Sequence, residues 1–146
     1  MKRNLIIIFL FLIFFNSKAS SHALHYKDLV SLEYDILHNN KIIGFHKFNF
    51  NKKSDFLHVI SEGEFKVTKI GLEIMNYQTR TEEKYKNNQL VSYNSKTLQN
   101  DKTKYVNLKL NNTTLVYEIN GSSFTGNVEN KESIIGSWWN HEIIKK

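Results

Sequence analysis

The best candidates in this chain for a pair of catalytic carboxylates are the consecutive residues Glu82 and Glu83. Paired carboxylates about 5 Å apart cleave glycosidic bonds, and Trp138-Trp139 offers aromatic surface on which a sugar stacks. Consecutive residues of a strand point to opposite faces of the sheet, however, so a strand here would separate Glu82 from Glu83. We therefore interpret both as part of a solvated strand with cross-strand ion pairs, and Trp138-Trp139 as core or as the cap of a barrel end. An envelope glycan hydrolase stays the weakest of three functional hypotheses.

Three histidines are candidates for a metal site. His46 and His58 lie on adjacent predicted strands, so their side chains could face one another. His38 lies one hairpin earlier. Zinc sites recur with closely spaced ligands such as His-x-x-x-His, and none of these three histidines lies so close to another in the sequence. We interpret the three as ordinary surface or half-buried histidines, and predict neither a metal nor a cofactor.

Arg80 is the only arginine after the first few residues in a chain that otherwise uses lysine. A planar guanidinium that donates in fixed directions is not interchangeable with lysine, so the position has a specific interest. By strand parity its side chain shares a face with polar neighbours such as Gln78 and Lys84, which favours an outward orientation. An inward orientation would require a partner such as Glu62 or Glu64, because an unpaired buried charge is strongly unfavourable.

Other catalytic signatures are missing. There is no Gly-x-Ser-x-Gly, no glycine-rich phosphate loop and no cysteine nucleophile. The sequence therefore predicts no catalytic residue, and the protein is expected to be non-enzymatic.

The N-terminus has the three parts of an export signal. Lys2-Arg3 is positive, Leu5–Phe15 is apolar, and small residues precede a cut after Ala19 or Ala23. A membrane-spanning helix needs about 20 apolar residues, whereas this stretch stops at Asn16. We predict a cleavable signal peptide over residues 1–23, a periplasmic or extracellular location, and no stable membrane span after cleavage.

Composition restricts the partners of the mature chain. The absence of cysteine excludes disulfides and a lipidated N-terminal cysteine, so a lipoprotein is not expected. The formal net charge is +6, but Lys2, Arg3 and Lys18 would leave with the signal. The other basic residues are scattered among acidic ones, whereas a nucleic-acid binder concentrates them on one face. No nucleic-acid partner is predicted.

Residues 24–146 read as a single antiparallel β domain. Runs rich in β-branched and aromatic residues alternate with short polar turns, and several runs alternate apolar and polar residues, as half-buried strands do. No convincing long amphipathic helix follows the signal to cover the apolar face, so the meander is expected to curl into a barrel, a half barrel or a sandwich. The predicted strands are Ser31–His38, Lys41–Phe50, Phe56–Val67, Leu72–Lys86, Gln89–Leu98, Lys102–Leu110, Thr113–Ile119 and Ser122–Val128.

The turns are predicted from residues that tolerate positive φ. Four pairs are suited to two-residue turns, and a bend or bulge is expected at Lys69–Gly71. The four pairs are Asn39-Asn40, Asn87-Asn88, Asn111-Asn112 and Asn120-Gly121, the last with the strongest turn signal.

Several segments, spread over about residues 30 to 140, carry a family resemblance. They include Ile42-Ile43-Gly44-Phe45-His46-Lys47-Phe48, Ser61-Glu62-Gly63-Glu64-Phe65-Lys66-Val67, Asn88-Gln89-Leu90-Val91-Ser92 and Ser137-Trp138-Trp139-Asn140. In these the chain resembles an uncharacterised family of exported bacterial β-proteins, the domain of unknown function numbered 6134. The resemblance implies no catalytic residue and no ligand. Members of the family typically continue with further strands, so it also implies a chain that is truncated at its C-terminal end, or whose last hairpins are dispensable.

Three functions follow as expectations. The first is a non-enzymatic envelope protein that binds a lipid or another apolar ligand inside its curved sheet. The second is an interaction module that pairs an exposed edge strand with a protein partner. The third is the glycan hydrolase already described.

Overall fold

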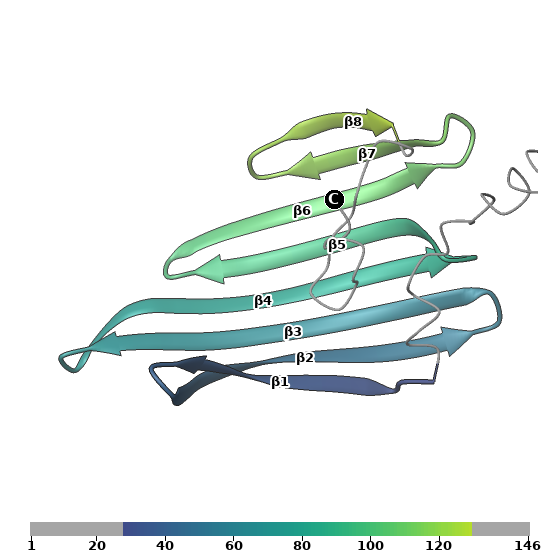
Figure 1. The fold of residues 1–146 in the computed structure, drawn as a ribbon. Coiled ribbons are helices and arrows are strands. Elements are labelled where there is room, and N and C mark those ends of the chain that lie inside the picture. Colours follow the sequence, from purple (N-terminus) through teal and green to yellow (C-terminus); the bar gives the residue numbers. More distant parts are fainter. Residues whose placement is uncertain (1–27, 130–146) are drawn as a thin grey trace, which may run out of the picture.

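The computed structural model describes residues 28–129, and within them the chain forms one antiparallel sheet (Figure 1). The predicted signal peptide and Trp138-Trp139 lie outside the described residues. The strand order follows the sequence from β1 to β8, and the described part contains no helix. The strands are β1 (Ser31–His38), β2 (Lys41–Lys53), β3 (Phe56–Lys69), β4 (Leu72–Lys86), β5 (Gln89–Gln99), β6 (Lys102–Asn111), β7 (Val116–Gly121) and β8 (Thr125–Glu129).

The all-β meander is confirmed, but its closure is not. Each strand pairs only with its sequence neighbours, and no pairing within residues 28–129 joins β1 to β8. The described sheet is therefore open, neither a closed barrel nor a two-sheet sandwich. No helix among these residues is long and apolar enough to cross a membrane.

Two of the asparagine turns form as predicted. Asn39 and Asn40 have φ of 50° and 60°, and Asn87 and Asn88 have φ of 49° and 65°. Positive φ at both central residues is the geometry that matches the twist of an antiparallel hairpin. A third such turn lies at Ile70-Gly71, with φ of 53° and 75°, where a bend or bulge was expected. The bulge is nearby, between Val67 and Thr68, and Ile70-Gly71 itself reverses the chain between β3 and β4.

Of the other two predicted turns, the one at Asn111-Asn112 forms with a greater length, and the one at Asn120-Gly121 is wrong. Asn111 starts a longer turn, because its side-chain oxygen accepts hydrogen bonds from the backbone of Thr113 and Thr114 at 3.0 and 3.2 Å. Strand β7 therefore begins only at Val116, three residues later than expected.

Asn120-Gly121 is not a turn but the end of β7. Gly121 pairs with Val106 in the β6–β7 ladder, and the pairing extends one residue further through Ser122. The backbone N–H of Ser122 donates to the backbone carbonyl of Tyr105. In return, the backbone N–H of Tyr105 donates to Ser122 Oγ at 2.8 Å. The chain reverses only after these bonds are made, at Ser122–Phe124.

Strand register divides the sheet into two faces. The face we call the apolar face carries Phe48, Val59, Tyr85 and Leu108, and the opposite polar face carries Lys47, His58, Arg80 and Asn107. Successive residues alternate between the two, as the pleat requires.

The buried core occupies the apolar face toward the β2–β3, β4–β5 and β6–β7 turns. Its members are Phe48, Phe50, Val59, Tyr85, Leu90, Leu108, Leu110 and Tyr117. The hydroxyl of Tyr117 on β7 donates to the carbonyl of Leu90 on β5 at 2.9 Å, reaching past β6. Strands lie about 4.8 Å apart, so this contact across two strand spacings indicates that the sheet curves toward its apolar face.

Candidate functional site

A hollow opens on the apolar face at the other end of strands β1–β4. Its volume is about 660 Å³. Its lining is mostly apolar and aromatic: Tyr34, Ile36, His46, Phe48, Gly63, Phe65, Met75, Tyr77 and Thr79. Phe48 belongs both to this lining and to the buried core, so the two regions meet there.

Register aligns the lining in two rows across four strands. One row runs Tyr34, His46, Gly63 and Thr79, and the next runs Ile36, Gly44, Phe65 and Tyr77. Each row contains one glycine in the middle of the sheet. Of the two, only Gly63 lines the hollow, and because it has no side chain between His46 and Thr79, the floor there lies at the backbone.

The two glycines differ in how firmly they are required. A Cβ on Gly44 would lie 1.9 Å from the carbonyl oxygen of Glu64, closer than any real contact, so only glycine fits between the paired strands. A Cβ on Gly63 would lie 3.2 Å from Thr79 Cγ2 and 3.4 Å from His46 Cδ2. Gly63 therefore accepts a small side chain after a slight shift of its neighbours, and that side chain would project into the hollow.

Aromatic rings form the walls. Phe65 and Tyr77 are stacked with centroids 4.9 Å apart, and His46 and Phe48 lie 4.3 Å apart. Tyr34 meets Phe48 edge to face at 6.1 Å. Stacked and edge-to-face rings hold one another in place, so the walls are largely formed before any ligand arrives.

His46 is the group of this lining whose ordinary pKa lies closest to neutral pH. Burial lowers the pKa of His46 below its ordinary value of 6.5, because the apolar surroundings disfavour the charged imidazolium. The neutral ring predominates at pH 7, and the hollow then presents a largely uncharged surface. Such a surface suits an apolar ligand.

Glu82 and Glu83 do not form a catalytic pair. As the alternation of the strand predicted, they lie on opposite faces. Glu83 is buried on the apolar face, where its Oε2 accepts a 2.6 Å hydrogen bond from the hydroxyl of Tyr85. Glu82 is half exposed on the polar face, with its Oε1 3.4 Å from Arg80 Nη2. Two carboxylates on either side of a sheet cannot flank one glycosidic bond.

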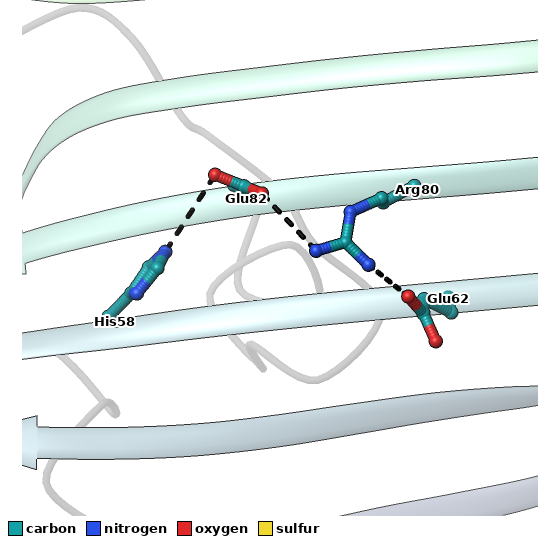
Figure 2. Close-up of polar contacts among 4 residues, drawn as sticks. All are labelled: His58, Glu62, Arg80 and Glu82. Atoms are coloured by element: carbon teal, nitrogen blue, oxygen red, sulfur yellow. Dashed lines mark hydrogen bonds and ion pairs between the residues drawn. The ribbon is translucent and has the colours of Figure 1, made fainter.

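Arg80 points outward, as expected from its polar neighbours. Figure 2 shows its guanidinium between Glu62 on β3 and Glu82 on β4, and it forms ion pairs with both. Glu62, considered at the sequence level as the partner of an inward Arg80, is thus its partner on the outer face. Glu82 also lies 4.0 Å from His58 Nε2. Arg80 is therefore shared between two carboxylates in a half-exposed network on the polar face.

The histidines do not converge. His46 is on the apolar face and His58 on the polar face, so the expectation that they could face one another is wrong. Their strands are adjacent, but the register pairs His46 with Gly63 and His58 with Asn51. His38 lies at the exposed end of β1, 3.3 Å from the side-chain nitrogen of Asn39. Residues 28–129 hold no group of three metal-ligating side chains.

Sequence reasoning placed Gly44, His46 and Phe48 on one face but did not identify the hollow. The signal was present in Gly63 of β3, a position without a side chain on the apolar face. Its effect depends on which residues lie beside it, and the register of the neighbouring strands decides that.

The comparisons with known proteins agree with the family resemblance. The family whose model matches is described as a domain of unknown function, DUF6134, and the match covers residues 34–146. The curated proteins and the solved structures give no match. The match supplies no functional residue.

Proposed function

We propose that this chain, which belongs to the DUF6134 family, is a non-enzymatic carrier that binds an apolar ligand such as a lipid chain in the hollow of its apolar face. The observation that carries the proposal is the hollow floored by Gly63 between His46 and Thr79 and walled by aromatic rings. Sites for small apolar molecules are concavities of about 300–1,000 Å³ with mainly apolar linings, and this hollow falls in that range.

The compartment is part of the same proposal. The N-terminal signal features would deliver the protein to the periplasm or the extracellular medium, where a lipid chain needs a carrier because it is poorly soluble in water. N-terminal sequencing of the protein recovered from its source tests this step. A mature terminus at Ser20 or Leu24 supports export, and an intact Met1 in the cytoplasm contradicts it.

Ligand binding is tested on the purified chain. Organic extraction followed by mass spectrometry should identify a co-purifying apolar compound, and titration with the neutral fluorophore N-phenylnaphthylamine should give saturable binding. Gly63→Val places a branched side chain on the floor of the hollow. We expect it to weaken probe binding by about tenfold, which corresponds to losing roughly 1.4 kcal/mol of apolar contact.

The matched control is Gln78→Val. Gln78 is exposed on the polar face one residue before Thr79, so the change also introduces valine into the middle of the sheet but leaves the hollow intact. Probe affinity should stay at the wild-type value in this variant. Equal binding by the wild type and Gly63→Val, with both folded by circular dichroism, would show that the probe does not enter the hollow.

The second function, pairing of an edge strand with a protein partner, has one observation in its favour. Within residues 28–129, β1 pairs on one side only, with β2. A strand with a free side is a template for an added strand. Cross-linking in intact cells that captures a partner through Glu33 or Asp35 would favour this function over ligand carriage.

A further inference from the structure

We propose that the β1–β2 and β3–β4 hairpin ends form a membrane-docking tip that inserts into the interface of an anionic lipid bilayer. The docking proposal stands on the tip itself, and its purpose, exchange of an apolar ligand between bilayer and hollow, rests on the proposed function. We call Leu37, Ile42, Ile70, Leu72 and Ile74 the aliphatic tip. In Figure 1 the two hairpin turns lie at the same end of the sheet, as the antiparallel order requires.

The aliphatic tip is unusually exposed. Ile70 is 92% exposed and Leu72 71%, and the three others are also more than half exposed. Single exposed apolar residues are ordinary on protein surfaces, but several aliphatic residues gathered on two adjacent hairpin ends indicate an interaction site. The site projects from the sheet as two turns. Such a projection is better suited to insertion into a deformable lipid interface than to binding in a rigid pocket of a partner protein.

The backbone conformation of Ile70 also supports an interaction site at the tip. With φ of 53°, Ile70 is the β-branched residue among the non-glycine positions with positive φ in the described part of the chain. β-Branched residues are true outliers in this region, whereas asparagine adopts it readily and occupies it at both central positions of the Asn39-Asn40 and Asn87-Asn88 turns. A strained and exposed isoleucine is unfavourable for the free protein, which indicates a role in contact with something else.

Charge favours an anionic bilayer as the occupant. Lys41 directly precedes Ile42, Lys69 directly precedes Ile70, and Lys66 lies on β3 behind them. The acidic neighbour Glu73 lies 3.9 Å from Lys66 and offsets one of these charges, and His38 adjoins Leu37. An apolar projection flanked by Lys41 and Lys69 combines insertion between acyl chains with attraction to acidic headgroups.

The tip also adjoins the hollow. Ile36 of the hollow precedes Leu37 of the tip, and Met75 of the hollow follows Ile74 of the tip. Docking by the tip would bring the nearby end of the hollow to the membrane. An apolar ligand could then pass between bilayer and hollow with little exposure to water.

A site-specific label tests insertion directly. The chain has no cysteine, so Leu72→Cys can carry a single environment-sensitive nitrobenzoxadiazole (NBD) group, and Asn112→Cys carries the same group in an exposed turn at the opposite end of the sheet. The full chain is mixed with phosphatidylcholine vesicles with and without phosphatidylglycerol. We expect a rise in emission at position 72 that requires phosphatidylglycerol and is quenched by doxyl-labelled lipid, with no change at position 112.

The position contrast also separates tip insertion from binding through the apolar N-terminal segment, which would not bury position 72 selectively. Equal changes at both positions, or no change at position 72 on vesicle-bound protein, would overturn the proposal. So would a change at position 72 that appears without vesicles as protein concentration rises, because the tip would then dock to a second copy of the chain.

Two substitutions complete the test. Ile70→Asn creates an Asn-Gly turn, which keeps the hairpin geometry while removing the most exposed side chain of the tip. We expect vesicle affinity to fall by about tenfold, since a buried aliphatic side chain contributes strongly to interfacial binding. The control Leu115→Asn removes another exposed aliphatic residue with positive φ, but from the opposite end, and should leave vesicle affinity unchanged. Equal losses in both variants would contradict the proposal.

Probe binding without vesicles separates the two proposals. Ile70→Asn should bind N-phenylnaphthylamine like the wild type, because Ile70 does not line the hollow. Insertion of position 72 without probe binding would refute carriage and leave docking in place. Probe binding without insertion would refute docking alone.

Discussion

Arg80 owes its position to the register of β3 and β4 rather than to any need for a buried charge. The pairing of Glu62 with Arg80 puts an acid directly opposite, and Glu82 lies two residues along the same face. Opposite charges facing one another across a pair of strands stabilise a sheet by only a few tenths to about 1 kcal/mol. The lone arginine is therefore explained as an element of a surface ion-pair network.

A small stability effect follows for this residue. Arg80→Leu should lower the free energy of unfolding by less than about 1 kcal/mol, because exposed ion pairs contribute little. Urea denaturation of the variant and the wild type measures the difference. A loss above about 3 kcal/mol is the size expected for a buried pair, and would mean that this face is covered.

His46 is expected to make the free energy of unfolding depend on pH. Burial places the pKa of His46 in the folded state below that of the unfolded chain, so the unfolded state binds more protons as pH falls through about 6.5. The stability contribution of the neutral imidazole is therefore present above the unfolded pKa, and it is lost progressively as pH falls toward the folded pKa.

We expect His46→Gln to lose less stability than the wild type between pH 7.5 and pH 5, since it removes the group that gains a proton on unfolding. Chemical denaturation at several pH values gives both curves. Parallel curves for the two proteins would show that His46 does not contribute to acid sensitivity.

Among the elements, hairpin turns separate what local sequence determines from what it does not. Asn39-Asn40 and Asn87-Asn88 were predictable because each asparagine favours the backbone angles that a two-residue turn needs. Asn120-Gly121 has the same local signal, yet Tyr105 on β6 pairs with Ser122 and keeps the pair in the ladder. The bond depends on a residue that is distant in sequence, so local pattern could not reveal it.

The Asn111 turn shows a second limit. One side-chain oxygen accepts two backbone N–H groups, and the side-chain nitrogen donates to Glu118 at 2.9 Å. Asparagine is suited both to a tight turn and to capping a longer one. The residue type was informative about the presence of a turn, but not about its length.

The strained backbone at Ile70 is expected to lower the stability of the fold by a measurable amount. Ile70→Asn should raise the free energy of unfolding by about 1 kcal/mol, because asparagine tolerates positive φ. Removing the isoleucine side chain costs little, since it is almost fully exposed in the folded protein. Equilibrium denaturation with urea measures the gain. A loss of stability would mean that Ile70 makes contacts that hold the hairpin together.

At the scale of the whole molecule, one face of a single sheet serves two purposes. Large residues at one end, including Tyr85 and Leu110, form the buried core, and Gly63 lies on the floor of the hollow at the other end. Alternation in the sequence predicted the apolar face but not this division. The division arises only when register places Gly63 beside His46 and Thr79, and such lateral neighbours cannot be read from the order of residues along one strand.

The open sheet makes its edge a further determinant of behaviour. β1 pairs on one side only within residues 28–129, and its polar-face residues include the exposed Glu33 and Asp35. Charged residues and irregular pairing discourage strand addition at an edge, and β1 also has a register shift between Ile36 and Leu37.

Removing both charges should therefore promote self-association. We expect Glu33→Val/Asp35→Val to form dimers or larger species whose fraction grows with protein concentration, because valine favours strand pairing and no longer repels an approaching copy. Sedimentation velocity over a concentration series measures this. The control Glu64→Val/Gln78→Val adds valines at two directly paired positions of β3 and β4, interior strands whose backbone groups already have partners on both sides. Equal association of both double variants would mean that added surface hydrophobicity, rather than the edge of β1, controls assembly.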